Sequence, residues 1–197
     1  MVLNRRKPMS KREDILNAAK ALLWERGYEA MSPRAVMDAS GAGQGSLYHH
    51  FRTKQDLAAA ALEQVAAELI GDFDSFLARA PGSSLDRIRA WLLRPRDGLA
   101  GCRLGRLANE TALDDERLRA PLCTYFSHVQ RRLGALVDDA MAEGMLPESL
   151  DGEKLAAMLV AVIQGGYVLS RARRDARFLG HATAGACALL EQAARNG

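Results

Sequence analysis

The chain of 197 residues is 48% hydrophobic but only 6% aromatic, so it is long enough for one large or two small cores filled mainly by aliphatic side chains. Its formal net charge is +3, yet residues 1–54 alone hold ten Lys and Arg against five Asp and Glu, which predicts a polyanionic partner for that quarter. Three widely spaced cysteines, no apolar leader and no uninterrupted run of about 18 apolar residues argue against a disulfide framework, export or a membrane span, so we expect a cytoplasmic protein.

The first predicted element is an amphipathic helix over residues 11–26. Apolar side chains recur there at steps of three and four residues, from Ile15 to Leu23. Ser10 and Glu13 have the spacing of a capping box at its start, and Gly27 stands where a left-handed residue ends a helix.

Two short helices are predicted next. Ser32 is the expected N-cap of the first, Pro33 takes its first helical position, and Gly41 ends it. The second is expected over residues 44–50, because Leu47 and the following Phe51 fall on one face, four positions apart, and point to a core.

A long helix is then predicted to open at the capping pair Thr53 and Asp56, with an apolar stripe that starts at Leu57. Beyond Pro81 the pattern predicts a shorter helix, followed by a loop around Gly98 and a helix whose first turn holds Cys102.

Three further helices are expected over residues 116–143, 152–174 and 175–195. Pro121 should either delay the start of the first of these or kink it. No stretch shows strand-like alternation bounded by hairpin turns, so the fold is predicted to be all-α with about nine helices.

The predicted elements have the arrangement of a helix-turn-helix: a longer helix comes first, and two short helices joined by a glycine-containing turn follow, with basic flanks. The second of the two short helices enters the DNA major groove in such a motif. The stretch "ILNAAKALLWERGYEAMSPRAVMDASGAGQGSLYHHFRTKQDL" resembles the N-terminal domain of the TetR family of bacterial transcriptional regulators, closely over residues 11–57. The resemblance implies a helix-turn-helix DNA-binding domain with a basic N-terminal arm over residues 1–55, and a helical effector-binding and dimerisation domain over residues 56–197.

The predicted second short helix would read the DNA. Gln44 and Ser46 lie at its N-terminal end and are suited to hydrogen bonds with base edges. We expect phosphate contacts by the side chains of Ser32, Arg34, Tyr48, His49 and Lys54. The backbone N–H groups at the helix starts would add further donors. The basic arm at residues 5–12 either reaches the adjacent minor groove or remains a solvated tail.

Some residues depart from the family pattern or suggest other chemistry. Ala42 and Gly43 stand where the family usually has Val-Ser, which weakens the cap of the reading helix, and Gly45 costs about 1 kcal/mol of helix propensity relative to Ala. His49 and His50 are adjacent on a helix and point about 100° apart, so they cannot chelate one ion together. We expect neither a metal nor a cofactor.

The family resemblance also implies a homodimer and a small-molecule effector. The last two predicted helices carry many small and branched residues, which suit a four-helix bundle made from two copies. Candidate effector contacts are the polar, aromatic and thiol side chains on otherwise apolar segments, although core packing explains each of them at least as well: Trp91, Cys102, Asn109, Tyr125, Phe126, His128, Gln164 and Tyr167.

Cys102 has two interpretations. At the first turn of a helix, with Arg103 and Arg106 close by, it would be favoured as a thiolate and could sense an electrophile or oxidant. The alternative is a small buried hydrophobe. Cys123 and Cys187 lie in apolar helical settings and are expected to be structural.

The sequence therefore predicts a TetR-like one-component regulator, with repression as the family default, which binds a palindromic operator in double-stranded DNA and is released by an effector. A phosphate loop, an HExxH motif and a recognisable nucleophile–base pair are all missing from the sequence, so we do not expect an enzyme. The alternative is a helical dimeric interaction module that has lost specific DNA binding, for which Gly43 and Gly45 leave room.

Overall fold

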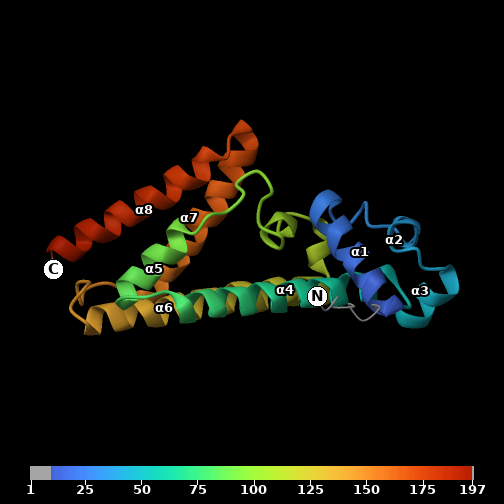
Figure 1. Cartoon of the computed structure of the whole chain (residues 1–197), viewed down its shortest axis with the longest axis horizontal. Helices are drawn as coiled ribbons and strands as arrows, with labels where there is room; N and C mark the ends of the chain where they lie inside the picture. The colour runs from blue at the N-terminus through green and yellow to red at the C-terminus, as the bar shows by residue number, and fades with distance from the viewer. Residues whose placement is uncertain (1–9, 197) are drawn as a thin grey trace, which may run out of the picture. The chain divides into compact units, whose positions relative to one another are not determined.

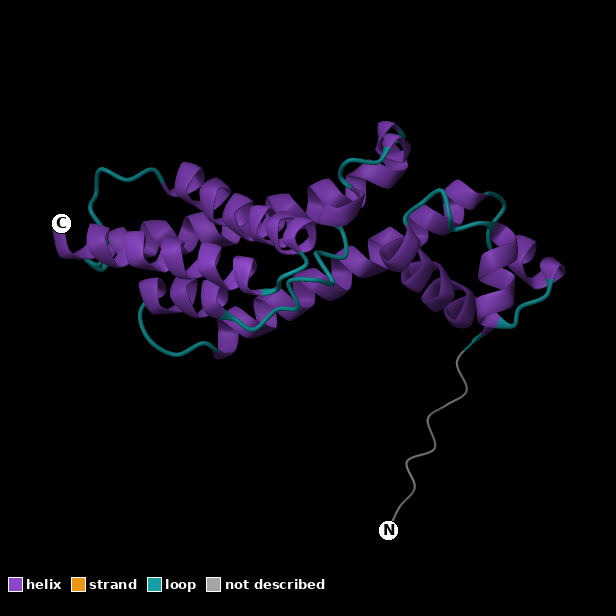
Figure 2. Ribbon diagram, turned by 90° about the horizontal axis from the view of Figure 1, so that it is seen from above, coloured by secondary structure: helices purple, strands orange, loops and turns teal. Residues whose placement is uncertain are grey.

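The computed structural model describes residues 10–196, so most of the predicted basic arm lies outside the described residues. Within them the chain forms eight α-helices and two short 3-10 turns, and Figure 2 shows no strand in this part. The all-α prediction is confirmed, with eight helices where about nine were expected.

The chain divides into two compact units. The first consists of residues up to Ala66 together with Arg106–Leu122, and the second of Ala67–Gly105 together with the residues from Cys123 onward. Two long helices, α4 over Lys54–Arg79 and α6 over Glu116–Ala142, contribute a part to each unit.

The first helix, α1, spans Lys11–Arg26 as predicted. Its capping box is formed, because the Ser10 hydroxyl accepts from the Glu13 N–H and the Glu13 carboxylate accepts from the Ser10 N–H, 2.7 Å away. Gly27 ends α1 with φ of +83°, a conformation that side chains with a Cβ rarely adopt.

Helices α2 over Pro33–Ser40 and α3 over Gln44–His50 also have the predicted bounds (Figure 1). Gly41 lies between them in the left-handed region with φ of +63°, which turns the chain from one helix into the other. The core of this unit is formed by buried residues of α1, α2, α3 and the start of α4, and of the junctions between them: Ile15, Leu16, Ala19, Met31, Val36, Leu47, Phe51, Leu57 and Ala58.

The second unit contains α5 over Ser84–Leu93, α7 over Gly152–Arg173 and α8 over Arg177–Asn196, with the later parts of α4 and α6. Helix α8 packs against both α7 and α5. The core here is built mainly from aliphatic side chains with two aromatic ones, and it includes Phe73, Ile88, Trp91, Leu92, Leu133, Leu159, Ile163 and Leu179.

Helix α7 is the one described helix that is long and apolar enough, by length and composition alone, to cross a membrane. Core helices of soluble proteins pass the same test, and α7 contributes Leu159 and Ile163 to the core of the second unit. It therefore gives only weak support for a membrane span.

One prediction about a helix start was wrong. No α-helix begins at Cys102; an irregular loop leads instead into two 3-10 turns, η1 over Gly105–Leu107 and η2 over Thr111–Asp114. Three glycines, at positions 98, 101 and 105, weaken helix propensity in this stretch. Helix α6 starts at Glu116, as predicted, and continues through Pro121. Of the two alternatives for this proline, a delayed start is therefore excluded, and a kink stays a prediction.

Candidate DNA-reading and effector sites

Helix α3 presents one face to the core and one to solvent. Leu47 is 2% exposed, and Phe51, which directly follows the helix, is 5% exposed. These two side chains define the face of α3 that is turned to the core. Gln44 and His49 are exposed, Tyr48 is 45% exposed, and Ser46 is half-buried. The outer face of α3 therefore carries three of the seven residues predicted to contact DNA: Gln44, Tyr48 and His49. Gly43 gives α3 no side-chain cap, as predicted.

The start of α2 offers few free donors. The Ser32 hydroxyl oxygen accepts from the Ala35 N–H at 3.1 Å, and Pro33 has no N–H, so Arg34 supplies the free backbone donor of the first turn. The Arg34 side chain is exposed and has no acidic partner among residues 10–196. Its guanidinium is thus available to a phosphate.

Lys54, another predicted phosphate contact, is engaged inside the unit. Its ammonium lies 3.3 Å from the backbone oxygen of Glu29, 3.9 Å from the Glu29 carboxylate and 4.1 Å from the centre of the Tyr28 ring. The Glu29 side chain is 85% exposed, so this ion pair is weak and can open when a phosphate competes. Thr53 and Asp56 form the predicted reciprocal cap of α4.

Sequence reasoning missed a contact that holds the end of α1, which we call the α1 clasp and define as Arg106 and Glu110. The Arg106 guanidinium donates to the backbone oxygens of Trp24 and Glu25, and the Glu110 carboxylate accepts from the Tyr28 N–H at 2.9 Å. The clasp completes the first unit with a segment that comes after α5 in the chain. Local patterns carry no signal for it, because its partners lie about 80 residues apart.

In the second unit, Trp91 lies beside a half-buried arginine that the sequence analysis did not select. The Arg96 guanidinium stacks over the Trp91 ring at 5.2 Å and donates to the backbone oxygens of Trp91, Leu92 and Arg94. These bonds close the C-terminal end of α5. In the sequence, "LLRPRDG" is typical of a solvated loop, so nothing there marks Arg96 as packed against Trp91.

Arg96 shares its surroundings with three of the predicted effector residues. Burial lowers the pKa of Arg96, and the nearby groups that act on it are Tyr167, Arg94, Tyr125 and Cys102. Burial also raises the pKa of the Tyr125 and Tyr167 phenols, which therefore stay neutral at physiological pH.

Gly105 brings two more predicted residues together. A Cβ at position 105 would collide with the Gln164 side chain and lie 3.3 Å from the Cβ of Cys102. The Cys102 thiol is half-buried, and its sulfur accepts from the Gly105 N–H at 3.3 Å. The helix dipole expected at Cys102 is missing because no helix starts there, and Arg103 forms an ion pair with Glu68 at 2.8 Å.

The other predicted effector residues have different surroundings. Phe126 packs against the Tyr125 ring, with centroids 5.0 Å apart. The His128 ring is held by the Asp74 carboxylate at 3.0 Å, and Asn109 is an exposed residue of the first unit. Cys187 is buried, as a structural residue should be, whereas Cys123 is exposed, contrary to expectation.

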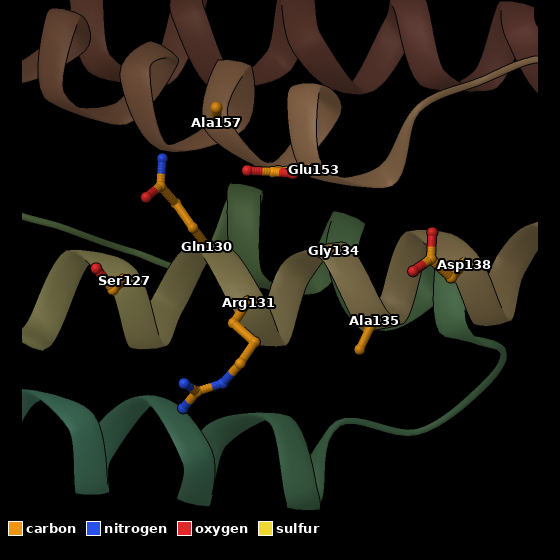
Figure 3. Close-up of a pocket in the computed structure, with 8 residues that line it drawn as sticks. All are labelled: Ser127, Gln130, Arg131, Gly134, Ala135, Asp138, Glu153 and Ala157. Atoms are coloured by element: carbon orange, nitrogen blue, oxygen red, sulfur yellow. The ribbon is translucent and has the colours of Figure 1, made fainter.

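An open cleft of about 570 Å³ lies between α6 and α7 (Figure 3). Gln130 points from α6 toward α7 and Arg131 points away from it. None of the predicted effector residues lines the cleft. Its lining combines polar and charged side chains with small residues: Ser127, Gln130, Arg131, Gly134, Ala135, Asp138, Glu153 and Ala157.

The helix-turn-helix with an exposed second helix, joined to a larger helical unit, defines the class of helix-turn-helix transcriptional regulators. The model of the bacterial regulatory proteins of the tetR family matches residues 15–61, and that of the tetracyclin repressor-like C-terminal domain matches residues 84–186. The chain therefore belongs to the TetR family.

Individual relatives agree with this assignment. An HTH-type transcriptional regulator of Mycobacterium tuberculosis is 32% identical over 171 residues, which cover 83% of this chain and 86% of the relative. The HTH-type transcriptional repressor KstR2 of Mycolicibacterium smegmatis is 26% identical over 151 residues, which cover 73% and 71% of the two chains.

Solved structures show the same fold. A TetR-family regulator from Agrobacterium tumefaciens has a TM-score of 0.82 at 25% identity and covers 95% of this chain and 99% of its own. The reduced form of E. coli NemR has a TM-score of 0.81 at 24% identity, with 90% and 95% covered.

Proposed function

We propose that this protein is a cytoplasmic, non-enzymatic repressor that binds a palindromic DNA operator as a homodimer and is released by a small-molecule effector. The observation that carries the proposal is the exposed face of α3, where Gln44, Tyr48 and His49 point outward while Leu47 is buried. Repression is supported by the similarity to KstR2, a transcriptional repressor whose match covers 73% of this chain.

In this proposal Gln44 and Ser46 read base edges, while Ser32, Arg34, Tyr48, His49 and Lys54 position the protein on the phosphates. The reading domain of residues 1–55 is joined to an effector and dimerisation domain of residues 56–197. Neither a metal nor a cofactor takes part.

The dimer would form through α7 and α8. Both helices expose large apolar side chains, with Val168 and Leu189 each 64% exposed and Met158 and Leu169 more than 40%. Large exposed apolar side chains gathered on two helices that pack together are costly in water and are typical of an interface. A second copy that packs the same two helices against it would bury these side chains.

Release requires that the effector bind more tightly to the conformation that cannot bind DNA. The stretch from Arg96 to Glu110 is suited to this coupling. Its first part contains Arg96 and Cys102, and its last part forms the α1 clasp. A change in this stretch would reach the helix that supports α2 and α3. Cys102 offers a second route, because it is a half-buried free thiol within the same stretch that an electrophile could modify.

The test is the selection of bound duplexes from a random pool by purified protein at physiological salt. Enrichment of a palindrome, with affinity that falls steeply as salt rises, is the expected result. A folded dimer that enriches no sequence would contradict the proposal and favour the interaction module.

A further inference from the structure

The cleft between α6 and α7 lies within the second unit and has the size of a ligand site (Figure 3). Its volume of about 570 Å³ falls in the range of pockets that hold small molecules. The two helices approach each other closely here, because a Cβ at Gly152 would lie 3.1 Å from the backbone oxygen of Gly134. Gly134 and Ala157 add little side-chain volume to the lining, so an alkyl or aryl group can lie against the helices.

Polar side chains of this cleft have no partner within the protein. Gln130 is half-buried and points from α6 toward α7, and its amide has no hydrogen-bond partner among residues 10–196. The Ser127 hydroxyl on the same helix also lacks a partner within this range. Because buried polar groups are normally hydrogen-bonded, a half-buried amide that faces an open cleft is available to a ligand.

The cleft also has an excess of negative charge. Asp138 on α6 and Glu153 on α7 line it from two sides, and neither carboxylate forms an ion pair among the described residues. Arg131, the cationic residue of the lining, points away from α7, and its guanidinium lies 3.3 Å from the His128 ring. Two carboxylates and an amide oxygen in one cleft suit an ammonium group, which has N–H donors and no acceptor.

We propose that this cleft binds an organic ammonium compound, with Asp138 and Glu153 as its anionic partners and Gln130 as a further acceptor. The alkyl or aryl part of the ligand would lie between the helices, where Gly134 and Ala157 leave room. None of the predicted effector residues lines this cleft, so it would be an additional binding site that does not depend on the proposed function.

The experiment uses full-length protein without DNA, and compares hexylamine and benzylamine with hexanol and benzyl alcohol, the neutral compounds of the same carbon skeletons. Thermal unfolding is measured with each compound at physiological salt, and an amine that raises Tm is titrated by calorimetry. Because a ligand stabilises the state that it binds, we expect at least one amine to raise Tm more than its alcohol does.

Substitutions then locate the site. Asp138→Asn and Glu153→Gln alter exposed carboxylates, and each should weaken the amine roughly three- to tenfold, with a larger loss in the double variant. The matched control is Asp139→Asn, which makes the same change at an exposed α6 residue outside the lining and should leave the affinity unchanged. Ala157→Leu adds volume to the cleft without a change of charge, and it should also weaken the amine.

Amines and alcohols that raise Tm equally, or a panel in which no amine raises it, would overturn the inference. Amine binding that survives the double variant would do the same, as would an equal loss in Asp139→Asn and Asp138→Asn. No DNA takes part in this measurement, so the proposed function is decided separately by the selection of operator duplexes.

Discussion

The carboxylate of Glu110 accepts a hydrogen bond from the backbone N–H of Tyr28, 2.9 Å away, across 82 positions of the chain. It also lies where a side chain at position 27 would have to stand, so Gly27 is required both by its positive φ and by this contact. The end of α1 is therefore defined by a distant segment as well as by its own sequence.

Removing this carboxylate should destabilise the first unit. In Glu110→Ala the half-buried Tyr28 N–H loses its partner, which costs about 1 to 3 kcal/mol in the free energy of unfolding. Urea unfolding measures the loss. The matched control is Glu63→Ala, at an exposed carboxylate of α4, which should change stability little. Equal effects of the two substitutions would contradict the role of the clasp.

Base reading and phosphate binding should separate by mutation. Gln44→Ala is expected to lose discrimination at one operator position by about 1 to 3 kcal/mol, while Arg34→Ala weakens binding to all sequences alike and lowers the salt slope by about one. Competition binding with single-base operator variants measures both. If Gln44→Ala weakens every site equally, the assignment of readout is wrong.

The proposed dimer interface predicts a change of oligomeric state. Val168→Glu on α7 places a charge where an apolar side chain is 64% exposed, and burial of that charge in the dimer is unfavourable. Sedimentation should show a shift from dimer to monomer. Met145→Glu alters another exposed apolar residue outside α7 and α8 and should leave the dimer intact.

The buried phenols predict a dependence of stability on alkaline pH. Burial raises the pKa of Tyr125 above the ordinary value of 10.0, so above that pH the unfolded chain loses this proton while the folded chain keeps it. The folded state then binds more protons than the unfolded state, and stability falls as pH rises. Unfolding free energies between about pH 8 and 11 should fall less steeply in Tyr125→Phe than in the wild type.

Electrophile sensing can be assigned to one thiol. If Cys102 is the sensor, N-ethylmaleimide should release DNA from the wild type and from Cys123→Ser, whose thiol is exposed, but not from Cys102→Ser. Fluorescence anisotropy of labelled operator measures the release. A response that persists in Cys102→Ser would exclude this route and leave a non-covalent effector.

Short-range signals were sufficient for the bounds of the first three helices. Ser10, Ser32 and Pro33 mark starts through bonds or fixed dihedrals within the first turn, and Gly27 and Gly41 mark ends through their own φ. Each of these effects acts within a few residues, so a single sequence contains the full information.

The stretch from Arg96 to Glu110 could not be predicted in the same way. Gly105 leaves room for the Gln164 side chain, and the Arg106 guanidinium donates to backbone oxygens of α1. Both partners lie far away in the sequence. A guanidinium in "RPRDG" has the same local pattern whether it is solvated or packed on an aromatic ring, so the contact of Arg96 with Trp91 appears only in the folded chain.

The sequence by itself thus determined the bounds of the first three helices and the outer face of α3, because caps, glycines and helical periodicity are local. The family was indicated by the resemblance over residues 11–57. Only the tertiary structure decided that Cys102 lies in a loop, that Glu110 holds the end of α1 and that Arg96 stacks on Trp91. Burial and long-range hydrogen bonds depend on which segments meet in space, and that information is shared among residues far apart in the chain.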